Sequence, residues 1–254
     1  MSARSVVASI LLPLERPALP VQALVRCCEL FGIAEGTTRV ALSRMVAAGE
    51  LEAAAGTYRL AGRLMIRHDQ QASARRPQLV EWSGSWVAAV VVAERRSAAE
   101  RAVLRHDLAR SHLAELRPGL WMRPDNLRGL VDTVASLGEP VAGHCIWLRA
   151  RMATDIDAPD DATLVAELWD LPTWAAEARR LVADLDATLP ELIGGRVEAL
   201  APCFTVAAAA VRHIMADPLL PDALLDDHWP GRDLRGRYDA YERAYRHLLG
   251  DWLR

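Results

Sequence analysis

Four polar side chains of types that contact nucleic acid fall on one face of a helix predicted over residues 35–48: Thr37, Arg39, Ser43 and Arg44. Hydroxyl and guanidinium groups reach base edges and backbone phosphates when a helix enters the DNA major groove. The other face of the same helix has the i, i+3, i+4 and i+7 spacing of a buried stripe, at Thr38, Ala41, Leu42 and Met45. The pattern therefore predicts a helix that contacts DNA.

Two further helices are expected to hold this one in place. Apolar periodicity predicts helices over 3–14 and 20–31, and Gly32 breaks the second of them. Gly49 supplies the stop of the helix over 35–48. A turn between two helices, the second of which presents polar side chains, is typical of a helix-turn-helix.

A short hairpin is expected next. Residues 50–60 predict two strands around a turn at Gly56, with Arg59 directed to the DNA side. Three helices followed by such a wing make a winged helix-turn-helix, which we predict for residues 1–68. The candidate DNA contacts are Thr37, Thr38, Arg39, Ser43, Arg44, Arg59 and Arg4.

Each of these contacts has a plainer alternative. Arg39 and Arg44 would equally suit a solvated helix face. Thr37 is close enough to the helix start to cap it instead of contacting a phosphate. Arg63 and Arg67 are weaker candidates of the same kind.

Charge is unevenly distributed along the 254 residues. The net charge is −3, and all 30 basic residues are arginine, which a bias toward GC-rich codons explains. Residues 1–76 carry ten arginines against six acidic residues, whereas residues 77–254 carry 20 against 27. A basic head on an acidic body is typical of a DNA-binding module attached to a dimerising or sensing body.

Beyond residue 80 the pattern changes to alternating strands and helices. Residues 62–78 are polar and arginine-rich, which predicts a linker or a short helix. The linker between the first two domains is placed at 69–80. Strands and helices then alternate over 87–93, 97–113, 116–124, 125–137 and 141–152. This β-α-β-α-β order fits a ferredoxin-like domain over 81–153. Helices over 161–169, 172–188, 203–215 and 233–253 predict a helical C-terminal domain over 154–254. The expected fold class is α+β, mostly helical.

Several site types are not expected. The four cysteines lack a Cys-x-x-Cys spacing, and no metal site is predicted. No apolar run reaches the ~18–20 residues of a transmembrane helix, so we expect a cytoplasmic protein.

Short motifs spread through the chain resemble one family, the phenylacetic-acid-catabolism repressors of the PaaX type. The motifs are Leu30–Ile33 with Thr38–Met45, Trp82–Trp86, Arg117–Trp121, Leu168–Leu171, and Asp217–Pro221 followed by Trp229–Gly231. Two features depart from the family pattern. Asp226 stands where a proline is usual, and the wing is short and nearly free of charge.

The resemblance implies a winged-helix N-terminus, a central ferredoxin-like domain similar to a small CRISPR-associated nuclease, and a helical C-terminal domain. It also implies a homodimeric repressor that leaves its double-stranded DNA operator when an aryl- or acyl-CoA thioester binds. The alternative is a metal-dependent nuclease or nucleic-acid-processing factor. A nuclease needs clustered carboxylates, but Glu94 at the end of the first strand is followed by Arg95 and Arg96. We therefore expect no enzymatic activity.

Trp121 and Arg123 are the candidate effector-binding residues, because they share one face of the strand over 116–124. An arginine suits the phosphates of CoA. The alternatives are a core position for Trp121 and an ion pair with the acidic C-terminal region for Arg123. No cofactor is expected apart from this effector.

Overall fold

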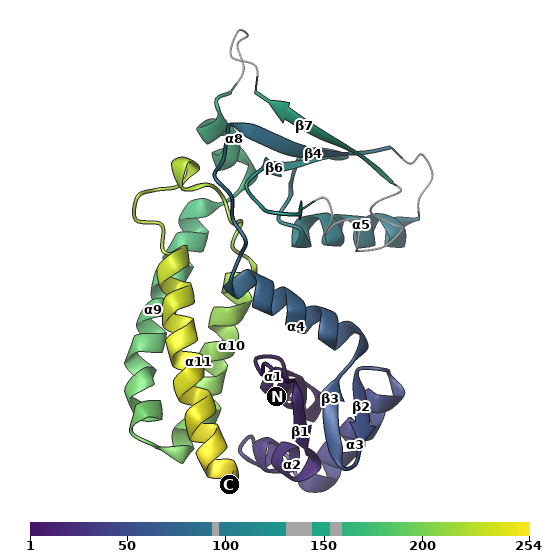
Figure 1. Ribbon diagram of the computed structural model, residues 1–254, viewed down its shortest axis with the longest axis vertical. Coiled ribbons are helices and arrows are strands. Elements are labelled where there is room, and N and C mark those ends of the chain that lie inside the picture. Colours follow the sequence, from purple (N-terminus) through teal and green to yellow (C-terminus); the bar gives the residue numbers. More distant parts are fainter. Residues whose placement is uncertain (93–96, 131–143, 153–158) are drawn as a thin grey trace. The chain divides into compact units, whose positions relative to one another are not determined.

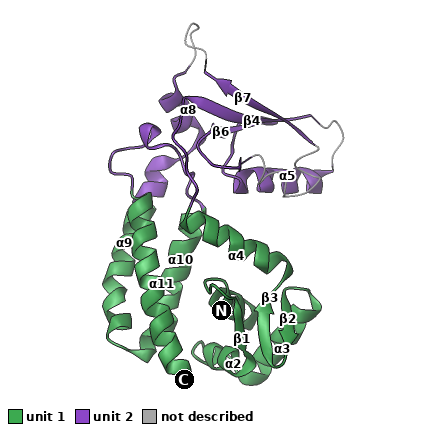
Figure 2. Cartoon of the chain, viewed as in Figure 1, with its two compact units in different colours: residues 1–76, 177–215, 230–254 green, residues 77–176, 216–229 purple. Residues whose placement is uncertain are grey.

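The computed structural model describes residues 1–92, 97–130, 144–152 and 159–254 (Figure 1). The chain divides into two compact units (Figure 2). The first unit contains residues 1–76, 177–215 and 230–254, and the second unit contains residues 77–176 and 216–229. The described elements confirm a mostly helical α+β fold. The domain borders expected from the sequence stay a prediction.

The first unit begins with three helices: α1 (Ala3–Leu11), α2 (Val21–Glu29) and α3 (Glu35–Ala47). These confirm the helices expected over 3–14, 20–31 and 35–48. The first is shorter than expected, because the chain turns before Pro13 and Pro17. All three pack on one another, since α1 contacts both α2 and α3.

A three-stranded antiparallel sheet completes this part of the first unit. It contains β1 (Ala18–Pro20), β2 (Leu51–Ala54) and β3 (Thr57–Leu60) in the order β1-β3-β2. The hairpin turn has positive φ at both Ala55 and Gly56, 47° and 73°, which is the twist that a two-residue hairpin requires. The expected hairpin is confirmed. The sequence did not predict β1, a three-residue strand that ends in a proline and depends on β3 for its pairing.

Helices from distant parts of the chain finish the first unit. The segment expected as a linker or a short helix forms α4 (Gly62–Arg75). The helix α10 (Leu200–Met215) packs against both α4 and α11 (Gly231–Leu253). The helix α9 (Leu171–Ile193) begins in the second unit and ends in the first. A short 3-10 turn, Val197–Ala199, precedes α10.

One stretch, Val197–Met215, is long and apolar enough to cross a membrane by length and composition alone. The sequence-based expectation counted only unbroken apolar runs and did not single out this stretch. Pro202, Arg212 and His213 interrupt the run. The helix α10 packs against α4 and α11 in the first unit, and core helices of soluble proteins pass the same test.

The second unit is built on a four-stranded antiparallel sheet. Its strands are β4 (Ser85–Val91), β5 (Ala114–Arg117), β6 (Leu120–Pro124) and β7 (Cys145–Arg151). The strand order is β5-β6-β4-β7. The helices α5 (Ala98–Arg110) and α8 (Asp161–Leu168) belong to the same unit, as does the 3-10 turn Asp222–Leu224. The described elements fit a ferredoxin-like fold.

The strand expected over 116–124 is in fact the hairpin of β5 and β6. Gly119 has a φ of +83° at the turn between them, and Pro118 precedes it, a pairing typical of a tight turn. The helix expected over 125–137 and the start of the strand expected over 141–152 lie largely outside the described residues, as do Glu94, Arg95 and Arg96.

Candidate nucleic-acid interface

The helix α3 separates its two faces as the sequence predicts. Thr38, Leu42 and Met45 are buried, whereas Ala41 is only half-buried. The exposed face carries Thr37, Arg39, Ser43 and Arg44. All four candidate contacts on this face are therefore open to solvent.

Val40 belongs to the same exposed face, and the sequence reasoning missed it. Its side chain is 51% exposed although it is apolar. The residue lies one turn after Gly36 and one turn before Arg44, in the centre of the face. The signal available in the sequence was a valine at a position of the polar face. Apolar side chains at such positions can contact thymine methyl groups.

The two arginines of α3 differ in their partners. Arg39 Nε donates a 2.7 Å hydrogen bond to Glu35 Oε1, one turn earlier on the helix. Within the described residues Arg44 makes no ion pair or side-chain hydrogen bond. Arg44 therefore presents an uncompensated charge, whereas the charge of Arg39 is partly compensated by Glu35.

The two threonines have different roles. The N-cap of α3 is Ala34, which supplies no side-chain bond, so Thr37 does not cap the helix. Thr38 is fully buried, and its hydroxyl donates to the Ala34 carbonyl at 3.3 Å. A side chain inside the core does not reach DNA, so this geometry argues against Thr38 as a direct contact.

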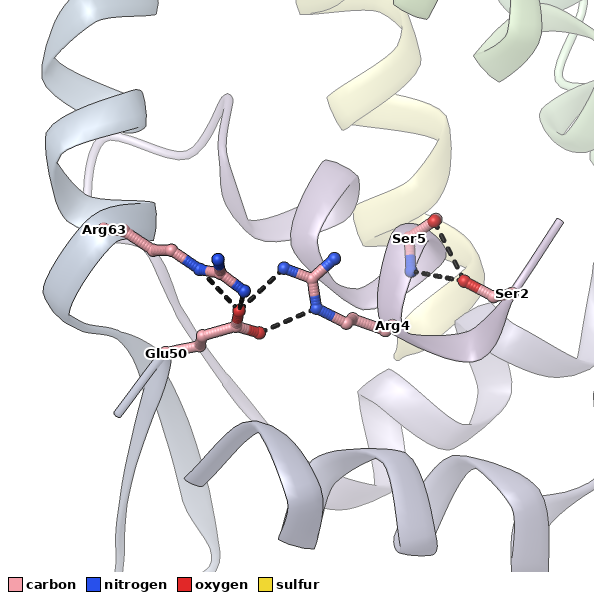
Figure 3. Close-up of polar contacts among 5 residues, drawn as sticks. All are labelled: Ser2, Arg4, Ser5, Glu50 and Arg63. Carbon is pink, nitrogen blue, oxygen red and sulfur yellow. Dashed lines mark hydrogen bonds and ion pairs between the residues drawn. The ribbon is translucent and has the colours of Figure 1, made fainter. Parts of the chain in front are cut away.

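Glu50 lies at the centre of an ion-pair cluster with Arg4 and Arg63 (Figure 3). Arg4 donates from Nε and Nη2 to the two carboxylate oxygens, at 2.8 and 2.7 Å. Arg63 Nε donates to Oε1 at 2.7 Å, and its Nη2 contacts the same oxygen. Only 1% of the Glu50 side chain is exposed. These bonds, above all those from Arg4, lower the pKa of Glu50 to about 2.

The cluster gives Arg4 and Arg63 a structural role. Arg4 comes from α1 and Arg63 from α4, while Glu50 lies just before β2. One carboxylate therefore joins three elements of the module. Both guanidinium groups remain substantially exposed, but they share one negative charge, so their combined field at a phosphate is reduced.

The wing carries one arginine, and it is paired. Arg59 Nε donates a 2.8 Å hydrogen bond to Glu52 Oε2, and the two residues are directly opposite in the β2–β3 register. The pair is exposed on both sides. Cross-strand ion pairs of this kind stabilise a hairpin, so the wing offers little net positive charge to DNA.

Trp121 and Arg123 lie inside the second unit. Trp121 belongs to the core cluster formed with β4 and α5, and Arg105 lies over its ring. Arg123 is fully buried and makes five hydrogen bonds, one for each of its five N–H donors. The acceptors are the carbonyl oxygens of His112, Pro124, Pro218 and Leu219 and the side-chain oxygen of Asn126.

No donor of Arg123 is left for a ligand phosphate. The residue instead clamps the loop after α10 onto the sheet, through carbonyl groups and not through the ion pair that the sequence suggested. Burial disfavours the charged form of Arg123 and lowers its pKa. The five hydrogen bonds offset this desolvation cost. The geometry therefore argues against an effector-binding role for Arg123, and Trp121 fits the core alternative.

The remaining chemistry-bearing residues form no further site among the described parts of the chain. No group of three histidine, cysteine or acidic side chains gathers there closely enough to hold a metal ion. All four cysteines are buried and free of disulfides. Burial raises the pKa of the Cys27 thiol to about 12, so it is not a reactive thiolate.

Comparison with known proteins places these observations in a family. The model of the PaaX-like protein matches residues 2–64, that of the PaaX protein central Cas2-like domain matches residues 79–161, and that of the PaaX-like protein C-terminal domain matches residues 169–252. The solved structure of the uncharacterised protein Rv0674 from Mycobacterium tuberculosis is similar, with 37% identity, 98% of each chain covered and a TM-score of 0.74. No curated protein sequence matches the chain significantly.

Proposed function

The chain belongs to the PaaX family of regulators, and we propose that it is a dimeric repressor that binds operator DNA through α3. An aryl- or acyl-CoA thioester is the proposed effector that releases it. This makes the protein a regulator and not an enzyme, and the cytoplasm is where we expect it to act.

The observation that carries the proposal is the exposed face of α3. Its helix is held by α1 and α2 and is followed by a hairpin, the order of a winged helix-turn-helix. Arg44 supplies an unpaired charge for a phosphate or a guanine edge, and Thr37 and Ser43 supply hydroxyl groups beside it. Most of the affinity is assigned to this face, because the wing arginine is already paired with Glu52.

A dimer is proposed because one such helix reads too few base pairs to locate its site among genomic competitors. The edge of the second unit's sheet is consistent with a second copy. Within the described residues β7 pairs only with β4, and it exposes Ile146 and Leu148 on one face. An apolar edge strand is a template for pairing with another chain.

The effector would act by shifting a population. A ligand that binds the DNA-incompetent form more tightly lowers operator affinity by its differential affinity for the two forms. By reciprocity, DNA then lowers ligand affinity by the same factor.

The test begins by selecting bound sequences from random duplexes with the full-length protein. Fluorescence anisotropy on the selected duplex then measures specific binding, and sedimentation measures the stoichiometry. Incubation with magnesium or manganese separates a regulator from a nuclease. We expect a shifted, uncleaved, palindromic duplex bound by two copies. Cleavage, or the absence of any selected sequence, would overturn the proposal.

A further inference from the structure

The first unit contains a cavity of about 80 Å³ where four helices meet. Residues near the end of α1, together with α4, α10 and α11, line it. Its apolar wall includes Ile10, Leu12, Phe204, Ala208 and Val211. This volume has room for roughly five water-sized groups, which suits a short chain or a single ring.

A buried polar group without a partner lies in the wall of this cavity. Tyr245 is only 9% exposed and lines the cavity. Its hydroxyl is buried and has no hydrogen-bond partner within the described residues. Leaving such a group unsatisfied costs about 1–3 kcal/mol. An unpaired hydroxyl of a cavity-lining residue, beside the apolar part of the wall, is a candidate partner for a ligand oxygen.

The charged residues that line the cavity are mostly cationic. Arg67 and Arg212 are exposed and make no ion pair or side-chain hydrogen bond within the described residues. Arg246 Nε lies 2.6 Å from Glu242 Oε1, in ion-pair contact but without hydrogen-bonding geometry. Three arginines against one glutamate favour a ligand whose outer end is anionic.

We propose that this cavity is the effector site, and that it takes an acyl group of about six carbons with an anionic end near the arginines. The inference deepens the proposed regulatory function. The effect of the ligand on DNA binding rests on that function, whereas ligand binding itself does not require DNA. A free carboxylate and the phosphates of an acyl-CoA both provide the anionic end. The site lies far along the chain from Trp121 and Arg123.

Aromatic contacts connect the cavity to the helix-turn-helix. The ring of Phe204, in the cavity wall, meets that of Phe31 edge to face, with centroids 5.1 Å apart. Phe31 lies in the turn between α2 and α3. The ring centroid of Phe204 also lies 6.3 Å from that of Tyr245. A ligand that displaces Phe204 would therefore alter the packing of the turn that orients α3.

The end of α1 is part of the cavity wall and also contacts α4. His68 Nδ1, on α4, lies 2.8 Å from the carbonyl oxygen of Leu12, and Leu12 lines the cavity. Because α1 also packs on α3, both routes lead from the cavity to the DNA-contacting helix. This gives the effector a physical means of acting on DNA affinity.

The test is isothermal titration of the full-length protein, without DNA, with hexanoate, hexan-1-ol and hexanoyl-CoA. Hexanoate or hexanoyl-CoA should bind at one site per chain, at least tenfold more tightly than the alcohol. Binding of only one of them identifies the source of the anionic end. Failure of both anions to bind would overturn the inference.

Matched variants locate the binding. Ala208→Leu fills the cavity and should weaken binding at least tenfold, whereas Ala209→Leu, next on α10 but outside the lining, should stay within twofold. Tyr245→Phe should weaken binding roughly two- to tenfold without lowering the melting temperature, and it keeps the test decisive if Ala208→Leu does not fold. Unchanged affinity in Tyr245→Phe and in folded Ala208→Leu would place the ligand elsewhere and overturn the inference.

DNA binding is measured separately, so the two proposals fail separately. If the protein binds the ligand, loses that binding in Ala208→Leu and selects no duplex, the ligand site is supported and the DNA-binding regulator is rejected. If the protein binds operator DNA, but none of the ligands changes that binding or gives a heat of binding, the regulator is supported and the ligand site is rejected.

Discussion

Arg4 and Glu50 form a bidentate ion pair across 46 positions of the chain, with N–O distances of 2.8 and 2.7 Å. The carboxylate is buried, whereas about half of the arginine side chain stays exposed. Bidentate pairs between arginine and carboxylate are strong and geometrically specific. Two arginines that a DNA-binding surface would use, Arg4 and Arg63, are therefore also part of the module's framework.

Glu50→Gln should destabilise the protein by about 1–3 kcal/mol, because the charged hydrogen bonds of a buried carboxylate are lost. Urea unfolding of the variant against the wild type measures this. The released arginines should also steepen the salt dependence of non-specific DNA binding, with a slope larger by up to about two. A variant with unchanged stability would show that the cluster is not structural.

The same pair predicts a pH dependence of stability. The pKa of Glu50 is lowered from 4.5 to about 2 in the folded protein, so its contribution is complete above pH ~4.5 and is lost as the pH falls toward about 2. The stability difference between wild type and Glu50→Gln should therefore be constant near neutral pH and shrink in acid. Chemical unfolding at a series of pH values measures it. A difference that grows in acid would contradict the assignment.

Arg44→Ala should weaken specific DNA binding by about 1–3 kcal/mol if Arg44 contacts a base edge. Loss of only a phosphate contact should reduce the salt slope by about one instead. Arg39→Ala should have the smaller effect, because Arg39 already pairs with Glu35. Anisotropy titrations at several salt concentrations separate these cases, with Arg110→Ala on α5 as the control. Wild-type affinity for Arg44→Ala would remove this face from the interface.

Val40→Ala should reduce discrimination at one base pair of the operator while leaving non-specific affinity unchanged. The reason is that an exposed apolar side chain contributes through a thymine methyl group and not through charge. Repeating the sequence selection with the variant measures this directly. An unchanged preference at every position would show that Val40 does not face a base.

Arg123→Met should destabilise the protein by about 2–4 kcal/mol, because four carbonyl oxygens and the Asn126 side chain each lose a charged donor. Thermal unfolding measures the loss. At a temperature where the variant remains folded, its affinity for hexanoate or hexanoyl-CoA should equal that of the wild type. Selective loss of ligand binding in a stable variant would restore the effector role for Arg123.

Local patterns in the sequence were enough to predict much of the architecture. The helices α1, α2 and α3, the hairpin turn at Gly56 and the exposed face of α3 each follow from periodicity and turn chemistry within a dozen residues. The sequence also carried the resemblance to the PaaX family, which the family models confirm. A side chain's place on a helix face depends on that helix's own spacing, so it is readable locally.

Only the tertiary structure decided which arginines are available. Arg4 pairs with Glu50, which is 46 positions away in the sequence. Arg123 donates to the carbonyl oxygen of Pro218, which is 95 positions away. Such partners have no signature in the chain's spacing, because distant segments are brought together by packing. The cavity beside Tyr245 arises in the same way, from helices contributed by both ends of the chain. Composition and periodicity describe each helix that lines the cavity separately, but the cavity itself forms only when those helices pack together.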